Sequence, residues 1–389
     1  MAANQETQTE GLTGLLSLGF AFNPFERLEA SNDPYIADCL IGHDMFAVAW
    51  ETAPAAIFAP AGGGKTAMRI YTLRACWLSN SKRRKFPISY DLPLFASPGD
   101  LTCLEAHQLG LAAAAATDLL LACASRPSIY LDLSIPRRLH LLSLLQAALP
   151  ADLGYALDLL AETADPRALS ERLDRTYLLP EPASPAAVRQ FCSAAQRDLK
   201  DASTGLWGNA ALFDALLAFI FEDLSFESVL ILLDGVDGSG FQAGNLQAQF
   251  ELIAPLLNQA TAWEEQRVYL KAFLPLELDT YLADQSPIFY QQFLRAEIRW
   301  DVPKLAEILR RRVYVASQGR FGSLDAVSSP ALRDVETMIA ARCRPLPREA
   351  ITFAGMVFLN YLKRQGEYIE SRDISRAEKE YFQRSIFPD

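Results

Sequence analysis

The segment Ala56–Tyr71 (AIFAPAGGGKTAMRIY) places three consecutive glycines, a lysine and a threonine between an apolar run and a segment with helical spacing. Apolar residues over Ala53–Pro60 predict a short strand that leads into the glycines, and the pattern over Lys65–Asn80 predicts a helix. Glycines let main-chain N–H groups approach an anion closely, and the first turn of a helix presents N–H groups without partners. The segment fits either a phosphate-binding loop or a flexible turn with a lysine on its rim.

A phosphate-binding loop gives each polar position a task. Lys65 would reach the terminal phosphates, and Thr66 would offer its hydroxyl to Mg²⁺. Ala59 stands where the pattern GxxxxGK[ST] has its first glycine, and alanine can serve there if its φ is negative. The predicted nucleotide-binding residues are Ala61, Gly62, Gly63, Gly64, Lys65, Thr66 and Ala67.

A second segment, Ser228–Gly238 (SVLILLDGVDG), has the continuous apolar run of a buried parallel strand and ends in acidic residues. Asp234, at the carboxyl end of that strand, would hold Mg²⁺ through water, so Thr66 and Asp234 are the predicted metal ligands. Asp237 would orient or activate the attacking water. Taken alone, Asp-Gly is also a favoured turn pair. The two segments together favour a nucleotide site.

Strands alternate with helices before the chain becomes wholly helical, which predicts the α/β class with a three-layer core and a parallel sheet. Further strands are predicted over Phe86–Pro93, Gln266–Pro275 and Ala296–Trp300, and nearly everything from Thr102 to Trp207 is predicted to be helical. After Val302 the predicted helices cover residues 303–318, 329–342, 347–364 and 373–385. We expect an N-terminal segment over 1–50, a core over 51–300 with a helical insertion at about 126–207, and a helical lid over 301–389.

Charge and cysteine content narrow the class of protein. A net charge of −11 over 389 residues counts against a chain coated for DNA or membrane binding. The two dense basic clusters, Ser81–Lys85 and Arg310–Arg312, are more typical of solvated helix ends than of nucleic-acid contacts. The six cysteines show no CxxC spacing, which predicts neither a disulfide framework nor a zinc site. The N-terminus lacks a basic signal region, and no membrane span is expected, so we predict a soluble cytoplasmic protein.

The stretches APAGGGKT and LILLDGVD and the C-terminal helices resemble the P-loop ATPases of the AAA+/STAND group. The sequence DGVD is similar to the Walker B segment of NACHT and related STAND proteins, and NPF at Asn23–Phe25 is similar to their adenine-side segment. Ile298–Val313 resembles the start of the helical lid in origin-recognition-type AAA+ proteins. Arg344–Phe358 resembles the sensor-2 stretch, in which Arg348 would reach the γ-phosphate.

This resemblance implies a P-loop NTPase core with a C-terminal helical lid, and ATP and Mg²⁺ as its ligands. It implies an ATPase that works as a molecular switch and controls self-assembly or a separate effector or sensor protein. Prokaryotic members of the group are associated with signalling and defence. The residues that would carry the chemistry are Asp234, Asp237 and Arg348.

Three departures from the family pattern concern hydrolysis. Gly235 follows Asp234 where the family usually has glutamate, and the strand over Gln266–Pro275 ends in AFLP, with Lys271 as its last polar side chain, so we expect slow hydrolysis. Ala59 at the first glycine position and the same strand end suggest a scaffold that binds nucleotide without hydrolysing it. A DNA-associated AAA+ loader or transposition-type regulator is a second alternative, and a small-molecule kinase is a weaker one. The chain has no NKxD motif for guanine, which favours ATP over GTP.

For several arginines and for the histidines, the sequence favours structural roles over catalytic or metal-binding ones. Three arginines near the predicted lid fit an arginine finger or, as the favoured role, a surface salt bridge: Arg295, Arg299 and Arg312. The three histidines have no second ligand at metal-binding spacing and are expected in core or boundary positions: His43, His107 and His140.

Overall fold

The computed structural model of the chain describes residues 18–79, 84–95, 103–175, 178, 183–202, 208–238, 244–364 and 366–386. Contacts divide these residues into two compact units. Unit 1 contains the described residues of 1–43, 61–67 and 298–389, and unit 2 contains those of 44–60 and 68–297. The chain therefore passes from one unit to the other several times.

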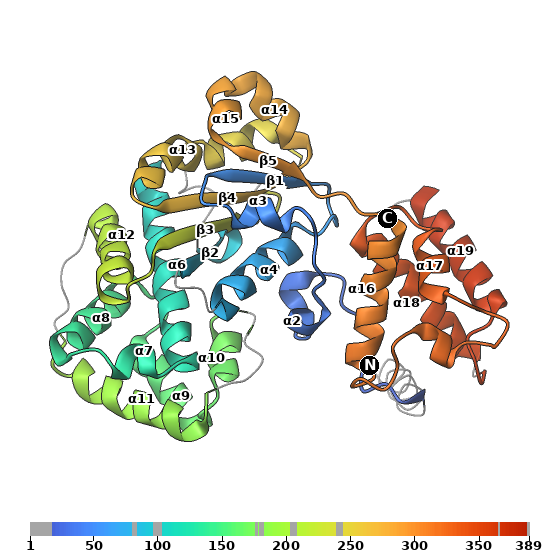
Figure 1. Cartoon of the computed structure of the whole chain (residues 1–389), viewed down its shortest axis with the longest axis horizontal. Coiled ribbons are helices and arrows are strands. Elements are labelled where there is room, and N and C mark those ends of the chain that lie inside the picture. The colour runs from blue at the N-terminus through green and yellow to red at the C-terminus, as the bar shows by residue number, and fades with distance from the viewer. Residues whose placement is uncertain are drawn as a thin grey trace, which may run out of the picture. The chain divides into compact units, whose positions relative to one another are not determined.

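Unit 2 is built on a five-stranded, all-parallel sheet with the strand order β2-β3-β4-β1-β5 (Figure 1). Its strands are β1 (Ala55–Ala59), β2 (Lys85–Asp91), β3 (Ser228–Asp234), β4 (Val268–Pro275) and β5 (Leu294–Glu297). The predicted strands are all present, which confirms an α/β fold with a parallel sheet. The last strand lies earlier than predicted, because residues 294–297 pair with Ala55–Phe58 of β1.

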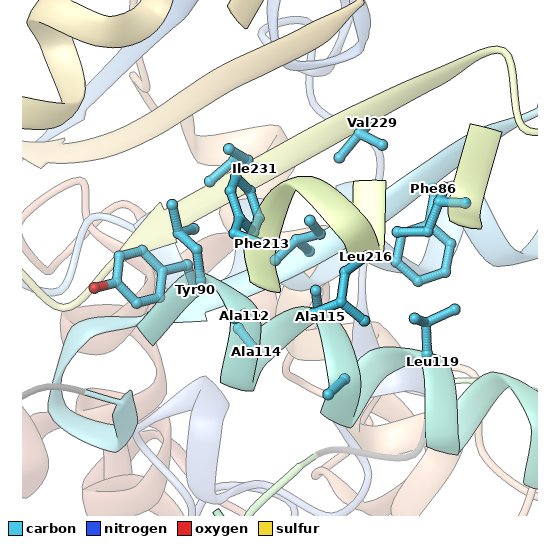
Figure 2. Packing of buried hydrophobic residues seen from close by; sticks show 14 of the residues in the cluster. Phe86, Tyr90, Ala112, Ala114, Ala115, Leu119, Phe213, Leu216, Val229 and Ile231 are labelled. Carbon is cyan, nitrogen blue, oxygen red and sulfur yellow. The ribbon is translucent and has the colours of Figure 1, made fainter. Parts of the chain in front are cut away.

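One face of the sheet is apolar and is covered by helices α6 (Leu104–Ser125), α12 (Asn209–Ala218) and α13 (Leu246–Glu265). Successive side chains of a strand point to opposite faces, so alternate residues of β2 and β3 meet these helices. The small side chains of Ala112–Ala116 let α6 lie close to the strands. Figure 2 shows side chains of this core, among them Phe86, Tyr90, Ala115, Leu119, Phe213, Leu216, Val229 and Ile231.

The predicted insertion is helical and shares the core of the sheet. Leu141, Leu157 and Phe191, from three of its helices, belong to the same buried cluster as the strands. Prolines begin several of these helices, where the missing N–H costs no hydrogen bond. The helices of the insertion are α7 (Ser128–Leu131), α8 (Ile135–Ala148), α9 (Leu153–Thr163), α10 (Pro166–Arg172) and α11 (Pro185–Leu199), and Figure 1 shows them grouped below α6 and α12.

Shorter elements complete unit 2. The helix α4 (Lys65–Leu78) follows β1 and passes from unit 1 into unit 2. The other elements are α3 (Phe46–Trp50), α5 (Leu92–Phe95), the π-helical turn η2 (Phe219–Asp223), α14 (Glu277–Gln285) and α15 (Pro287–Gln292).

Helix α6 is long and apolar enough to cross a membrane by length and composition. However, 72% of its most apolar window is buried inside unit 2, against the sheet and α12. Among the described residues, α8 and α9 together are also long and apolar enough to cross a membrane if they are taken as one span, but they are bent by 111° where they meet. The buried core helix of a soluble protein can have this length and composition, so α6 is consistent with a soluble protein.

The opposite face of the sheet carries buried lysines beneath α3. Lys271 of β4 is fully buried, and its Nζ donates to the main-chain carbonyl groups of Val48 (3.3 Å), Glu51 (2.7 Å) and Ala53 (2.7 Å). Three carbonyls match the three N–H donors of an ammonium, although burial lowers the pKa of Lys271 to about 7. Lys85 of β2 donates to the carbonyl of Trp50 and lies over its ring.

Unit 1 has a hydrophobic core of its own, formed by helices and the N-terminal segment. Phe20 and Phe25 pack against Phe358, with ring centroids 5.4 and 5.9 Å away. Arg312 donates to a carboxylate oxygen of Asp33 at 2.7 Å inside this unit. Its elements are η1 (Ala30–Asn32), α2 (Ile36–Cys39), α16 (Val302–Ala316), η3 (Leu324–Val327), α17 (Val335–Ala340), α18 (Pro347–Arg364) and α19 (Ser371–Ile386).

The helix predicted over 329–342 is wrong in its first part, because α17 begins only at Val335. Asp334 adopts a left-handed φ of 52°, which interrupts any helix before it. The carboxylate of Asp325, from η3, accepts the main-chain N–H groups of Asp334 and Val335, each at 3.0 Å. A side chain distant from the helix in sequence therefore caps its start.

Candidate functional site

The segment after β1 forms the glycine loop, which we define as Pro60–Gly64. Gly62 has φ 74° and Gly64 has φ 92°, values that L-residues with a side chain rarely adopt. Ala59 is the last residue of β1, pairs with Pro275 and is not among the residues with positive φ. Lys65 then begins α4, so the loop joins a buried parallel strand directly to the first turn of a helix.

Groups of unit 1 hold the carbonyl side of the glycine loop. The main-chain N–H of Arg348 donates to the carbonyl of Gly62 at 3.3 Å. The indole Nε1–H of Trp300 donates to the carbonyl of Gly63 at 2.8 Å. A side chain at Gly62 would stand only 2.9 Å from Cβ of Arg348. The loop therefore has its shape fixed by the residues that begin α18 and precede α16.

The side chain of Arg348, predicted to reach the γ-phosphate, pairs with Glu29 of the N-terminal segment at 3.5 Å. Both side chains are largely exposed, 44% for Arg348 and 59% for Glu29. An exposed ion pair contributes little to stability, because water and salt screen it. The guanidinium can therefore change partner at little cost.

At the carboxyl ends of β2 and β3, two carboxylates share one arginine. Asp91 and Asp234 end these strands and face each other in register. Arg69 of α4 donates from Nε to Asp234 Oδ2 at 3.0 Å and from Nη2 to Asp91 Oδ2 at 3.3 Å. The other oxygen of Asp234, Oδ1, accepts the N–H of Gly235 at 2.9 Å. Asp234 is buried, as predicted for the end of an apolar strand.

The same network continues to the outer edge of the sheet. Arg69 also donates to the hydroxyl of Ser89 on β2. Asp118 of α6 accepts the main-chain N–H of Ser89 at 2.7 Å, and Arg175 donates to the Ser89 carbonyl at 2.5 Å. Burial raises the pKa of Asp118 to about 6 and lowers the pKa of Arg175.

Two further positions bear on the predicted site, the second acid Asp237 and the end of β4. Asp237 is half-buried in the turn after β3, where the N–H of Gly238 donates to the carbonyl of Gly235. The end of β4, where a polar sensor would be expected, is apolar and buried at Leu274. The last polar residue before it, Lys271, binds carbonyls of the α3 segment instead.

Arginines near the predicted lid have partners within their own units. Arg295 forms the surface salt bridge favoured from the sequence, with Asp279 at 3.3 Å. Arg312 also forms an ion pair, but the pair is buried rather than on the surface. The carbonyl of Arg299 is 3.0 Å from Nε2 of His43.

The histidines follow the expectation in part. His43 and His107 are buried, and burial lowers the pKa of His107, which lies between Tyr90 Oη (3.1 Å) and the Leu252 carbonyl (2.8 Å). His140 is exposed, because the apolar stripe of α8 runs through Leu141 and the buried residues that follow. No cluster of three or more His, Cys, Asp or Glu suited to a metal ion occurs in the part of the chain that the structure describes.

The strand order of the sheet independently indicates that a ligand would bind at the carboxyl ends of the strands. From β1 the chain crosses β4 and β3 to reach β2, whereas the later connections run in the other direction. Crossovers between parallel strands are right-handed, so connections of opposite direction lie on opposite faces of the sheet. Ligands of open parallel sheets bind at the carboxyl ends of the strands, where this reversal occurs. The glycine loop leaves β1 at this edge, and Asp91 and Asp234 end their strands at it.

Sequence reasoning missed Arg69, Asp91 and Trp300. Arg69 had a signal, since it follows Lys65 by one helical turn and so lies on the same side of α4. Asp91 had a weaker one, as an acid near the end of the strand predicted over Phe86–Pro93, although the observed strand ends at Asp91 itself. Trp300 had none, because its contact with Gly63 joins residues far apart in the chain.

Comparison of the chain with protein-family models, with curated proteins and with solved structures found no match.

Proposed function

We propose that the chain is a Mg²⁺-dependent ATPase of the P-loop type that acts as a molecular switch. The observation that carries the proposal is the glycine loop, in which two left-handed glycines join a buried parallel strand to a helix that begins with Lys65 and Thr66. Loops of this construction present main-chain N–H groups to phosphates. The topology adds support, because the loop leaves the sheet at the edge where ligands of such folds bind.

The donor set suits a nucleotide with its metal. In this proposal the N–H groups of residues 61–67 hold the β- and γ-phosphates, and Lys65 neutralises their charge. Thr66 and Asp234 hold Mg²⁺, which would lower the negative charge on the γ-phosphate when bound. Mg²⁺ keeps several waters and takes few protein ligands, so a site with one hydroxyl and one carboxylate is sufficient.

The switch is the part of the proposal that concerns Arg348. Its main chain contacts Gly62, and its guanidinium has an exposed acidic partner in Glu29. A γ-phosphate would compete with Glu29 for this guanidinium, since phosphate is the more highly charged acceptor. The N-terminal segment would then be released or repositioned by nucleotide. We propose that this change controls self-assembly or a separate effector or sensor in the cytoplasm.

A nucleotide-binding scaffold that does not hydrolyse ATP is the second candidate. It is favoured by the engagement of both carboxylate oxygens of Asp234 and by the apolar end of β4. The DNA-associated alternative has less support. Arg310 and Arg312 form ion pairs with acidic groups of unit 1, and Arg311 donates to the carbonyl of Asp38.

Equilibrium binding of Mg²⁺-ATP and steady-state turnover test the proposal. The Lys65→Ala variant is expected to lose binding at least 100-fold, because the lysine charge on the phosphates is lost. Lys200→Ala, which removes an exposed lysine at the end of α11, is the matched control and should bind as the wild type does. Equal binding by the wild type and Lys65→Ala would contradict the proposal. Binding without turnover above Lys65→Ala would favour the scaffold.

A further inference from the structure

Hydrolysis needs a carboxylate near the attacking water in addition to the one that holds the metal. Sequence reasoning assigns this task to Asp237. The structure offers another carboxylate, Asp91, which ends β2 in register with Asp234.

Asp91 lies directly over the main chain that follows Asp234. A Cβ built on Gly235 would stand 2.7 Å from Asp91 Oδ1 and 2.5 Å from Cδ of Pro93. The space that any side chain at position 235 would occupy is therefore filled by the Asp91 carboxylate and Pro93. Gly235 is required here by this close approach as well as by its φ of 83°.

Arg69 fixes the separation of the two carboxylates. Its guanidinium is 6% exposed and holds one oxygen of Asp234 and one of Asp91 at the same time. A planar guanidinium binds two acceptors in a fixed geometry, so neither carboxylate can turn independently. Asp91 Oδ1 stays outside this contact, over Gly235. The Asp91 side chain is 17% exposed against 4% for Asp234, which leaves Asp91 open to water.

We propose that Asp91 is the second carboxylate of the site and orients the attacking water, with Arg69 as its positioning residue. The inference rests on the proposed function. The water oxygen forms a bond to the γ-phosphorus, and the bond from that phosphorus to the β–γ bridging oxygen breaks. The electron pair leaves with ADP, and the water proton passes to the Asp91 carboxylate and then to solvent. In this proposal Asp91 takes the role that the sequence assigns to Asp237.

The test compares Asp91→Asn with Asp237→Asn in the full chain. Asparagine keeps the size of the side chain and its ability to accept from Arg69 but cannot take a proton. We expect Asp91→Asn to bind Mg²⁺-ATP within about 3-fold of the wild type and to lose about 100-fold in kcat. Asp237→Asn should lose less in kcat than Asp91→Asn does. Circular dichroism and the unfolding midpoint show whether each variant is folded.

The turnover and binding results of the two variants and the wild type decide between the role of Asp91, the ATPase proposal and the scaffold. Loss of kcat in Asp91→Asn alone supports the inference. If Asp91→Asn turns over ATP as the wild type does, or if Asp237→Asn is the variant that loses kcat, the role of Asp91 is overturned while the ATPase proposal stands. If the wild type binds ATP without turnover, the role of Asp91 falls and the scaffold remains. If the wild type does not bind ATP, the proposed function itself fails. If Asp91→Asn does not fold, Asp91→Ser takes its place, and a turnover equal to that of the wild type without a carboxylate at this position overturns the inference.

Discussion

Several buried charged residues of unit 2 interact with main-chain groups. Lys271 binds three carbonyls of the α3 segment, and Ser89 has its N–H and carbonyl bound by Asp118 and Arg175. Because β2 is an edge strand, the outward groups of Ser89 have no neighbouring strand to pair with. Asp118 and Arg175 take the place of that strand and end the sheet at β2.

Replacing Lys271 tests how far one side chain supports the α3 segment. Lys271→Met should destabilise unit 2 by about 3 kcal/mol, because three buried carbonyls lose their donor. The folded pKa of Lys271 is about 7 against an ordinary value of 10.5, so the unfolded chain binds more protons between these values. Wild-type stability should therefore rise with pH across this window, and the Met variant should lack that rise.

Urea unfolding at about pH 7 and pH 9.5 measures both effects on Lys271→Met. The exposed Lys200→Met is the matched control and should behave as the wild type does. The same pH dependence in wild type and Lys271→Met would contradict the assignment of this titration to Lys271.

At the scale of elements, the sequence predicts the strands of the sheet and the loop that follows β1. Buried parallel strands are short continuous apolar runs, and SVLILLD of β3 and AAIFA of β1 have that pattern. The glycines of the loop were informative because Gly62 and Gly64 need a backbone conformation that other residues avoid. These signals are local, which is why a single sequence contains them.

The contacts missed by sequence reasoning depend on tertiary structure. Asp91 meets Asp234 only because β2 and β3 pair in one register, and no local pattern states which strands are neighbours. The start of α17 was misplaced because its cap comes from Asp325, in another element. The exposed position of His140 depended on which stripe of α8 faces the core. Neighbouring strands, distant caps and helix rotation are set by packing.

Trp300, which precedes α16, contacts the glycine loop directly through its hydrogen bond to Gly63. Trp300→Phe removes the Nε1–H donor to Gly63 and keeps an aromatic ring beside His43 and Gly64. We expect Mg²⁺-ATP to bind about 5-fold more weakly, corresponding to about 1 kcal/mol for one hydrogen bond that orients the loop. Titration calorimetry measures the change. Trp77→Phe, at a half-buried position of α4, is the control, and equal affinities of the two variants would contradict a role for Trp300.

At the scale of the whole molecule, the two units have separate hydrophobic cores. The core of unit 1 includes Phe353 of α18, and that of unit 2 includes Phe213 of α12, both fully buried. Residues 61–67, which include the glycines of the loop and the first residues of α4, belong to unit 1, although the strand before them belongs to unit 2. Each core can be weakened without touching the loop, so the two units can be told apart by their unfolding.

Nucleotide should therefore stabilise unit 1, which contains residues 61–67 of the proposed phosphate-binding segment. Phe353→Leu and Phe213→Leu are each expected to lower one of two calorimetric transitions, by about 1 kcal/mol of unfolding free energy. Mg²⁺-ATP at 100 times its Kd should stabilise the transition sensitive to Phe353→Leu by about 2.7 kcal/mol, since a ligand that binds only the folded form raises its stability by mass action. Lys65→Ala should abolish this shift. A single transition that both variants lower equally would contradict separate units, and a nucleotide shift confined to the Phe213-sensitive transition would place the binding residues outside the glycine loop.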